Sequence, residues 1–404
     1  MSDINIVDYG ACGNGKIDCT EIIQLAIERC ENGDRVIIPR GTFLTGAIFL
    51  KSNMTLVIEY GACLLGTKDL KKYPLMKYRF EGCEQLCHCS LINTDNKLFE
   101  NITIEGGGEI DASGEYLCFA ELNSNCAQRG RAVCMMNVRN LIIRNVTIRQ
   151  SPSWCLHLLF CKEVIIDNVH INTQFDKNGL IYKNIINGDG IDIDSCERVK
   201  IVNTLVASQD DCISVKSGKN KEGRDLGRIS KDILIENCSF QWGCGISIGS
   251  EMSGGVKNVR VIGCKFTNVL SIASIKTQRG RGGIVQDVSF QDCVHTNYDR
   301  GSFDRRQFWG VIYMNAFYKN EMEDTFLIKE VTEETPIVKD IYFRNLSIDT
   351  IKGNAIYVCG LPESPFENIR FVNIKARCEK GLEISNASHV KIDKVSIVTV
   401  KHHK

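Results

Sequence analysis

The chain has 404 residues, enough for two or three ordinary domains or for one long repeat domain. Lys plus Arg and Asp plus Glu both number 49, so the formal net charge is zero and nothing global attracts nucleic acid or an anionic membrane. We therefore predict no nucleic-acid partner and no membrane partner, and a charged ligand must be recognised locally. The composition leaves the oligomeric state open.

The first residues lack the basic region and apolar core of a signal peptide. Twenty cysteines occur in the chain. Because no export signal is seen, reduced thiols are the simpler interpretation, and we expect a cytoplasmic protein.

One amphipathic helix is predicted, over residues 20–30. Asp18 followed by Glu21 resembles a capping box, and Gly33 closes the segment. Because a solenoid must protect its ends, we predict that this helix caps the N-terminal end of the core, within a region 1–75 that also holds the first coils.

From residue 101 onward a short phrase recurs, in which apolar and polar residues alternate around a central Asn. Copies include residues 141–148 (LIIRNVTI), 164–171 (VIIDNVHI) and 233–240 (ILIENCSF). The alternation predicts strands with one buried face, and Asn tolerates the left-handed conformation of a sharp corner. The predicted corners are residues 145, 168, 203, 237, 263, 292, 345, 373 and 394.

Most intervals between these corners are 21 to 35 residues, which fits coils of three short strands with loops of varying length. The interval of 53 between residues 292 and 345 predicts an insertion over 296–336. Helical periodicity is nearly absent, so a doubly wound α/β fold fits poorly. We predict an all-β fold, a single-stranded right-handed parallel β-helix that forms one domain over residues 1–404.

Four triplets recur about one coil apart: residues 187–189 (NGD), 209–211 (QDD), 243–245 (GCG) and 274–276 (SIK). Because neighbouring coils lie about 4.8 Å apart, these positions should form a column. Three carboxylates and a lysine in one column suit the cleavage of a glycosidic bond in an acidic sugar polymer. Carboxylates about 6.5–9.5 Å apart leave room for the water that attacks in an inverting glycosidase. Crowding should raise the pKa of one carboxyl, which then acts as general acid. The alternative is a pair of solvated acids at a turn.

The sequence resembles glycoside hydrolase family 28, the polygalacturonases and their relatives, over nearly the whole chain. The resemblance rests on residues 8–18 (DYGACGNGKID), 36–46 (VIIPRGTFLTG), 152–157 (PSWCLH), 189–195 (DGIDIDS), 246–255 (ISIGSEMSGG) and 280–283 (GRGG). The last two phrases look most like bacterial members, many of which cut from chain ends. The resemblance implies a pectin-lyase-like solenoid and an enzyme of pectin degradation that needs neither a cofactor nor a metal ion.

The family's catalytic signatures are Asn-Thr-Asp, Gly/Gln-Asp-Asp, Gly-His-Gly and Arg-Ile-Lys. Carried over by position, they imply that Asp210 is the general acid and that Asp189 and Asp211 hold and activate the water. Lys276 would bind the substrate carboxylate.

Two positions depart from these signatures. Cys244 replaces the histidine and Ser274 replaces the arginine. A thiol is a weak hydrogen-bond donor, and serine lacks the fork with which arginine binds a carboxylate. Arg279 is close enough in sequence to compensate.

Other candidates are weaker. His157 either contacts the substrate or is a packed histidine, and Trp154 either stacks on a sugar ring or fills the core. Tyr318 is preferred to Tyr313 as the tyrosine that the family carries near its reactive subsite. The insertion 296–336 would wall off one end of the cleft and favour exo action.

These features predict hydrolysis of galacturonate-containing pectic oligo- or polysaccharides of the cell wall by inverting single displacement. A rhamnogalacturonan or substituted-galacturonan hydrolase of the same family remains open, as does a catalytically impaired, carbohydrate-binding β-helix. A calcium-dependent lyase is disfavoured because no clear calcium motif is seen.

Overall fold

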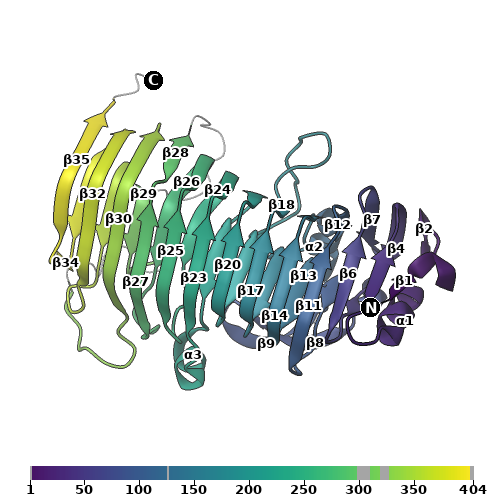
Figure 1. Cartoon of the computed structure of the whole chain (residues 1–404). Coiled ribbons are helices and arrows are strands. Elements are labelled where there is room, and N and C mark those ends of the chain that lie inside the picture. Colours follow the sequence, from purple (N-terminus) through teal and green to yellow (C-terminus); the bar gives the residue numbers. More distant parts are fainter. Residues whose placement is uncertain (1, 125–126, 298–309, 319–326, 401–404) are drawn as a thin grey trace. The chain divides into compact units, whose positions relative to one another are not determined.

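The structure, a computed structural model, describes residues 2–124, 127–297, 310–318 and 327–400 (Figure 1). The backbone separates into two compact units. The first unit comprises Met1–Phe80 and Glu84–Asp210, and the second comprises Glu81–Cys83 and Asp211–Lys404.

Parallel strands of the first unit stack coil upon coil in three columns (Figure 1, purple to teal). The first column is β1 (Asp3–Asn5), β3 (Arg35–Ile38), β6 (Met54–Ile58), β11 (Phe99–Glu105), β14 (Val138–Arg144), β17 (Lys162–Asp167) and β20 (Glu197–Val202). The second is β2 (Asn14–Asp18), β4 (Gly41–Thr45), β7 (Ala62–Gly66), β12 (Glu109–Asp111), β15 (Thr147–Arg149), β18 (His170–Asn172) and β21 (Leu205–Ala207). The third is β5 (Ile48–Phe49), β10 (Ile92–Asn93), β13 (Val133–Met136), β16 (Leu156–Leu159) and β19 (Ile191–Asp194). Two further strands, β8 (Leu75–Phe80) and β9 (Cys83–His88), form a small separate sheet.

The second unit repeats this arrangement, although several of its strands run through two columns without a break. Its strands are β22 (Ile213–Lys216), β23 (Ser230–Glu236), β24 (Ser239–Ile248), β25 (Val256–Ile262), β26 (Lys265–Lys276), β27 (Ile284–Gln291), β28 (Val294–Asn297), β29 (Gly310–Asn315), β30 (Ile337–Thr350), β31 (Asn354–Cys359), β32 (Phe366–Cys378), β33 (Gly381–Ser385), β34 (Ala387–Ser388) and β35 (Lys391–Thr399). The pairing between successive coils is again parallel. The predicted all-β, parallel architecture is confirmed for both units.

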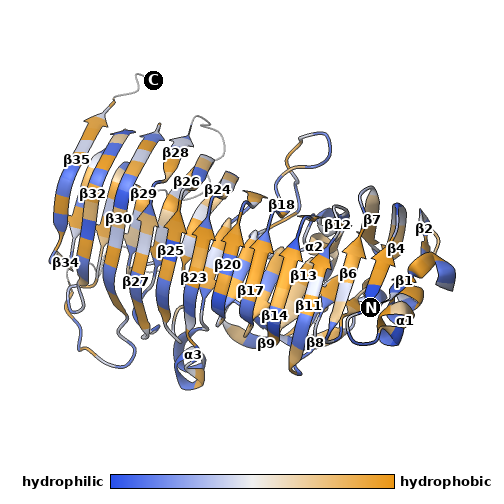
Figure 2. Ribbon diagram, viewed as in Figure 1, coloured by the Kyte–Doolittle hydropathy of each residue, from blue (hydrophilic) through white to orange (hydrophobic). Residues whose placement is uncertain are grey.

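The core of each unit is a set of in-register apolar columns. In the first unit one buried column begins at Val36 and continues through Leu56, Ile104, Ile143, Ile166 and Ile201. In the second unit the ring of Phe343 stacks between Phe290 at 5.6 Å and Phe371 at 5.3 Å. Figure 2 shows hydrophobic stretches within β14, β17 and β20, and hydrophobic residues alternating with hydrophilic ones along β30 and β32. Alternation with a period of two therefore decides which side chains are buried.

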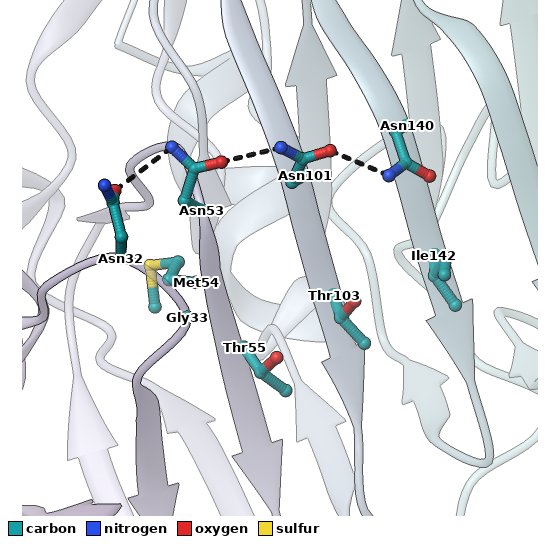
Figure 3. A pocket seen from close by; sticks show the side chains of 9 residues that line it. All are labelled: Asn32, Gly33, Asn53, Met54, Thr55, Asn101, Thr103, Asn140 and Ile142. Carbon is teal, nitrogen blue, oxygen red and sulfur yellow. Dashed lines mark hydrogen bonds between the residues drawn. The ribbon is translucent and has the colours of Figure 1, made fainter. Parts of the chain in front are cut away.

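All nine predicted corners adopt positive φ, from 51° at Asn203 to 65° at Gly263. Asn side chains connect several of them from coil to coil, as where Asn168 Nδ2 donates to Asn145 Oδ1 at 2.8 Å. A second line of corners, at the start of the first-column strands, was not predicted. Figure 3 shows its ladder of Asn32, Asn53, Asn101 and Asn140, joined by amide hydrogen bonds of 2.6 to 3.2 Å. The open groove beside this ladder has a volume of about 430 Å³.

The helical segments are η1 (Ile6–Tyr9), α1 (Thr20–Arg29), η2 (Leu70–Lys72), α2 (Gly114–Leu122) and α3 (Asn220–Leu226). The predicted amphipathic helix is α1, but its capping box is wrong. The N-cap residue is Cys19, which makes no side-chain cap bond, and Asp18 instead accepts a hydrogen bond from the backbone N–H of Thr20 at 2.8 Å. The sequence did not predict α2, because its apolar residues surround the helix instead of following one face.

The predicted insertion 296–336 contains the segments 298–309 and 319–326, which lie outside the described residues. Its central part is β29, a regular strand that pairs with β26 and β31. Among the nineteen described cysteines there is no disulfide. No helix in the described ranges is long and apolar enough to cross a membrane.

Candidate active site

Asp189 and Asp210 lie in successive turns of the first unit, just before β19 and just after β21. The backbone of Gly188 joins the turns. Its carbonyl accepts a hydrogen bond from the N–H of Gln209 at 3.0 Å, and its N–H donates to Oε1 of Gln209 at 3.1 Å. A Cβ at position 188 would lie 2.8 Å from Cγ2 of Ile185, so the close approach requires glycine. Both aspartates are thus attached to one backbone network.

Arg129 holds the segment that precedes Asp189. Its guanidinium donates to the carbonyl of Ile186 at 2.5 Å, to Oδ1 of Asn187 at 2.7 Å and to the carbonyl of Pro152 at 3.1 Å. This role of Arg129 was not predicted, because Arg129 and Asn187 are 58 residues apart in the chain. A buried guanidinium that satisfies three acceptors fixes the turn in one arrangement.

His157 and Trp154 lie in the core of the first unit. The imidazole is 0% exposed, with Nε2 3.8 Å from a carboxylate oxygen of Asp194. The indole ring stacks on Phe80 at 5.0 Å. These placements favour the packed histidine and the core tryptophan, which were the alternatives to substrate contact.

Asp194 is a buried acid outside the predicted set of catalytic residues. Burial disfavours its charge, but the Arg79 guanidinium at 2.6 Å and the imidazole of His157 outweigh this and lower the pKa of Asp194 to about 2. The ion pair of Arg79 and Asp194 stabilises β19, the strand of the third column that begins just after Asp189.

In the second unit the structure brings Asp211 and Lys276 together. Nζ of Lys276 donates to Oδ2 of Asp211 at 2.8 Å, and it lies 5.4 Å from the ring centroid of Tyr318. A carboxylate oxygen of Asp211 and Sγ of Cys244 are within 4.8 Å of each other. Asp211 is buried and Lys276 nearly so, which strengthens the ion pair relative to a surface pair. The predicted proximity of these groups is present inside this unit.

Cys244 sits at a β-bulge. The register between β24 and β26 shifts between Gly245 and Ile246, and Gly245 has φ of +90°. A Cβ at position 245 would lie 1.7 Å from the carbonyl oxygen of Ser271, so no other residue fits without moving the neighbouring coil. The bulge re-aims the chain immediately after Cys244.

Ser274 lies in β26, in register with Ser247 and Tyr313. The Tyr313 ring stacks on Tyr357 at 5.8 Å, and its hydroxyl accepts a hydrogen bond from Asn315 at 2.8 Å. Tyr313 is thereby fixed within the sheet, whereas Tyr318 accompanies Lys276.

Arg279 is engaged with protein acceptors. Its guanidinium forms two hydrogen bonds to the carboxylate of Glu363, at 2.5 and 2.8 Å, and a third to the carbonyl of Leu327 at 2.8 Å. Hydrogen bonds from Arg279 hold the pKa of Glu363 below its usual value. Compensation for Ser274 would require breaking this two-bond ion pair, so the placement does not support that role.

A second charged cluster near Lys276 was not predicted as a site. Glu251 lies 3.8 Å from Lys216. Burial raises the pKa of Glu251, but the charges of Lys216, Lys276 and Arg281 outweigh it and hold the pKa below its usual value. Glu251 and Arg281 belong to the phrases 246–255 and 280–283, on which the family resemblance rests, but no role was predicted for their side chains.

Known proteins resemble this chain along most of its length. A probable polygalacturonase of Vitis vinifera is 28% identical over 384 residues, which cover 92% of this chain and 73% of that protein. An exo-poly-alpha-D-galacturonosidase of Dickeya chrysanthemi is 28% identical over 444 residues, covering 92% and 71%. The crystal structure of a hyperthermoactive exopolygalacturonase from Thermotoga maritima superposes with a TM-score of 0.78 at 28% identity, covering 97% of this chain and 91% of that one.

The fold likeness to this exopolygalacturonase supports the predicted right-handed, pectin-lyase-like β-helix. The family model described as glycosyl hydrolases family 28 matches residues 89–391. This span includes every candidate site residue in both units. The chain therefore belongs to glycosyl hydrolases family 28.

Proposed function

We propose that the protein hydrolyses glycosidic bonds in galacturonate-containing pectic oligo- or polysaccharides, acting from chain ends. Family membership and the names of its relatives support the reaction and the substrate class. The observation that carries the assignment to residues is the ion pair of Asp211 and Lys276 at 2.8 Å, with Cys244 beside it. These groups come from three signature positions and meet inside one unit.

In the proposed reaction Asp210 donates its proton to the glycosidic oxygen that leaves. Asp189 and Asp211 together hold the water, and one of these two carboxylates accepts a proton from it as its oxygen attacks the anomeric carbon from the opposite side. The bond to the leaving sugar breaks as the bond to water forms, so the configuration inverts in one displacement. The joint action of the three aspartates rests on the sequence signatures and on the peptide bond that joins Asp210 to Asp211.

Lys276 is proposed to bind the carboxylate of the sugar in the reactive subsite. In the structure its ammonium already contacts Asp211, so a substrate carboxylate would share the ammonium or replace that contact. Tyr318, whose ring centroid lies 5.4 Å from that ammonium, is proposed to line the same subsite. Because Arg279 pairs with Glu363, recognition through Lys276 is favoured over recognition through a guanidinium.

The two departures from the family signatures favour a second candidate. Cys244 beside Asp211 changes the hydrogen bonding of that carboxylate, and Ser274 removes a positive charge from the column. A rhamnogalacturonan or a substituted galacturonan would present a different group at these positions. A catalytically impaired, carbohydrate-binding protein is the remaining alternative.

We also propose that α1 caps the N-terminal end of the first unit. The helix packs against β5 and η1 and buries Ile23, Ala26 and Ile27. A buried apolar stripe over the first coil would keep that edge from pairing with another chain.

The test is mass spectrometry of products from defined galacturonan and rhamnogalacturonan oligomers, combined with NMR of the first anomer released. Products heavier by one water with inverted configuration support the proposal, and the oligomer consumed identifies the linkage. Unsaturated products would indicate a lyase. An untouched panel with retained binding would indicate the impaired alternative.

A further inference from the structure

An exposed apolar surface lies on the same edge of the first unit as Asp189 and Asp210. On α2 the side chains of Tyr116 and Phe119 are 49% and 64% exposed. The loop between β18 and β19 adds Leu180, Ile181 and Ile186, which are also exposed. We call these five residues the α2 patch. Large apolar side chains gathered on a surface mark an interaction site more often than single ones do.

The loop is fastened to the helix beside Tyr116. The two carboxylate oxygens of Glu115 accept hydrogen bonds from the N–H groups of Lys183 and Asn184, both at 3.2 Å. Nδ2 of Asn184 donates to the carbonyl of Glu115 at 3.2 Å. Helix α2 and the loop therefore form one surface, and the Glu115 carboxylate is bound to the loop backbone.

The patch is continuous with the turn that carries the acids. Strands β12, β15, β18 and β21 pair in order, and α2, the loop and Asp210 follow β12, β18 and β21. Because coils are about 4.8 Å apart, α2 and Asp210 are separated by roughly 14 Å along the stack. Ile186, held through its carbonyl by Arg129, is three residues before Asp189. A short oligosaccharide whose end lies at the acids would extend over the patch.

The chemistry of the patch fits an acidic sugar. The C–H face of a pyranose ring packs on an aromatic ring, and an aromatic side chain orders few rotatable bonds on binding. Nζ of Lys68 lies 5.4 Å from the ring centroid of Tyr116, and the side chain of Lys183 is exposed on the attached loop. Tyr116 stays half exposed with the Lys68 ammonium over its ring, and such a surface suits a uronate better than a neutral sugar, because the carboxylate has a counter-charge.

We infer that the α2 patch is an accessory subsite that binds a uronate residue of the substrate chain remote from the bond that is cleaved. The inference rests on the proposed function for the substrate class. It adds that affinity grows with chain length, because only a longer oligomer reaches from the acids to Tyr116 and Phe119. It also assigns Lys68 a role in selecting acidic over neutral chains.

The experiment measures binding by calorimetry in the Asp210→Asn background, which leaves the oligomers intact. The probes are hexagalacturonate, digalacturonate and a neutral hexasaccharide. Tyr116→Ala combined with Phe119→Ala should weaken hexagalacturonate binding about tenfold or more, and digalacturonate binding less. Lys68→Met should reduce the preference for the acidic hexamer. Tyr60→Ala is the matched control, because Tyr60 is 87% exposed in the turn between β6 and β7.

Equal affinity of the double variant and its parent for hexagalacturonate overturns the inference, as does a parent that binds no hexagalacturonate. Turnover, measured with Asp210 intact, distinguishes a failure of the inference from a failure of the proposed function. If the enzyme cleaves galacturonan and the double substitution leaves the KM for long oligomers unchanged, the inference fails while the function stands. If the enzyme is inert but the double substitution weakens hexamer binding, the inference holds and the proposed function fails.

Discussion

The turns that carry Asp189 and Asp210 and the strand that carries Lys276 hold functional groups by different means. In the first unit the acids are attached to a backbone network around Gly188, with Arg129 fixing the preceding residues. In the second unit Asp211 is held directly by the Lys276 ammonium. Backbone hydrogen bonds position a turn without depending on one particular ion pair, whereas an ion pair makes each partner depend on the other.

Removing the acid in the backbone-held turn should have the largest effect on rate. Asp210→Asn should reduce turnover of the cleaved oligomer by about 10²- to 10⁴-fold, because the amide cannot supply the proton. The melting temperature should stay close to that of the parent, since the hydrogen bonds around Gly188 involve backbone groups and the side chain of Gln209, which the substitution keeps. Initial rates and thermal unfolding measure both, with the exposed Asp393→Asn as control. Near-parental rates would refute the acid assignment.

Removing the cation in the paired region should affect binding and stability together. Lys276→Met should raise the KM about tenfold to a hundredfold, because a charge-assisted hydrogen bond is lost. It should also lower the melting temperature, since Asp211 would be a buried charge without its counter-ion. Lys221→Met breaks an exposed pair with Asp225 of 2.6 Å and serves as the control, with little change expected. An unaltered KM in Lys276→Met would show that the lysine is purely structural.

The buried pair of Arg79 and Asp194 should make the first unit sensitive to acid. The folded pKa of Asp194, about 2, is below its ordinary value of 3.8, so the ionised form stabilises the fold. This contribution is present above about pH 4 and is lost as the pH falls to about 2, at about 2 kcal/mol in total. Asp194→Asn should flatten that part of the pH dependence of the unfolding free energy. Asp3→Asn breaks the exposed pair of Asp3 and Arg35, which has the same length, and should change the pH dependence of the unfolding free energy little. Equal effects of the two substitutions would contradict this prediction.

The smallest expected effect concerns the substituted signature position. Cys244→His should raise activity on galacturonate oligomers, by no more than about tenfold, if those oligomers are the natural substrate. The gain would reflect a stronger donor beside Asp211. Rates on galacturonan and rhamnogalacturonan, measured in parallel for the parent and for Cys244→His, test this prediction. Cys238→His is not a suitable control, because Cys238 is buried in the core. No gain, with activity on rhamnogalacturonan in the parent, favours altered specificity.

Much of the fold was predictable because the solenoid repeats a local pattern. Asn145, Asn168 and Asn203 were recognised as corners from alternation alone, and each has positive φ. Helix α1 was recognised from its apolar stripe. Helix α2 was missed because it exposes and buries apolar residues alike, so no periodicity marks it.

The candidate site was predictable only where spacing follows the coil. Asp211, Cys244 and Lys276 recur about one coil apart and meet in the second unit. Contacts that depend on side-chain direction were not predictable. Burial of His157 and the engagement of Arg279 with Glu363 are of this kind, because alternation does not say how far a side chain reaches or which neighbour it selects.

The sequence by itself determined the family, the strand repeat, the left-handed corners and the residue types available for acid catalysis. Each of these depends on short spacings or on motifs that survive without three-dimensional information. Only the tertiary structure decided that Gly188 and Arg129 fix the acid-bearing turn, that Lys276 is paired with Asp211, and that α2 lies on the edge that carries Asp210. Those contacts join residues from different coils or from the long loops between them, and the lengths of the loops obey no repeat.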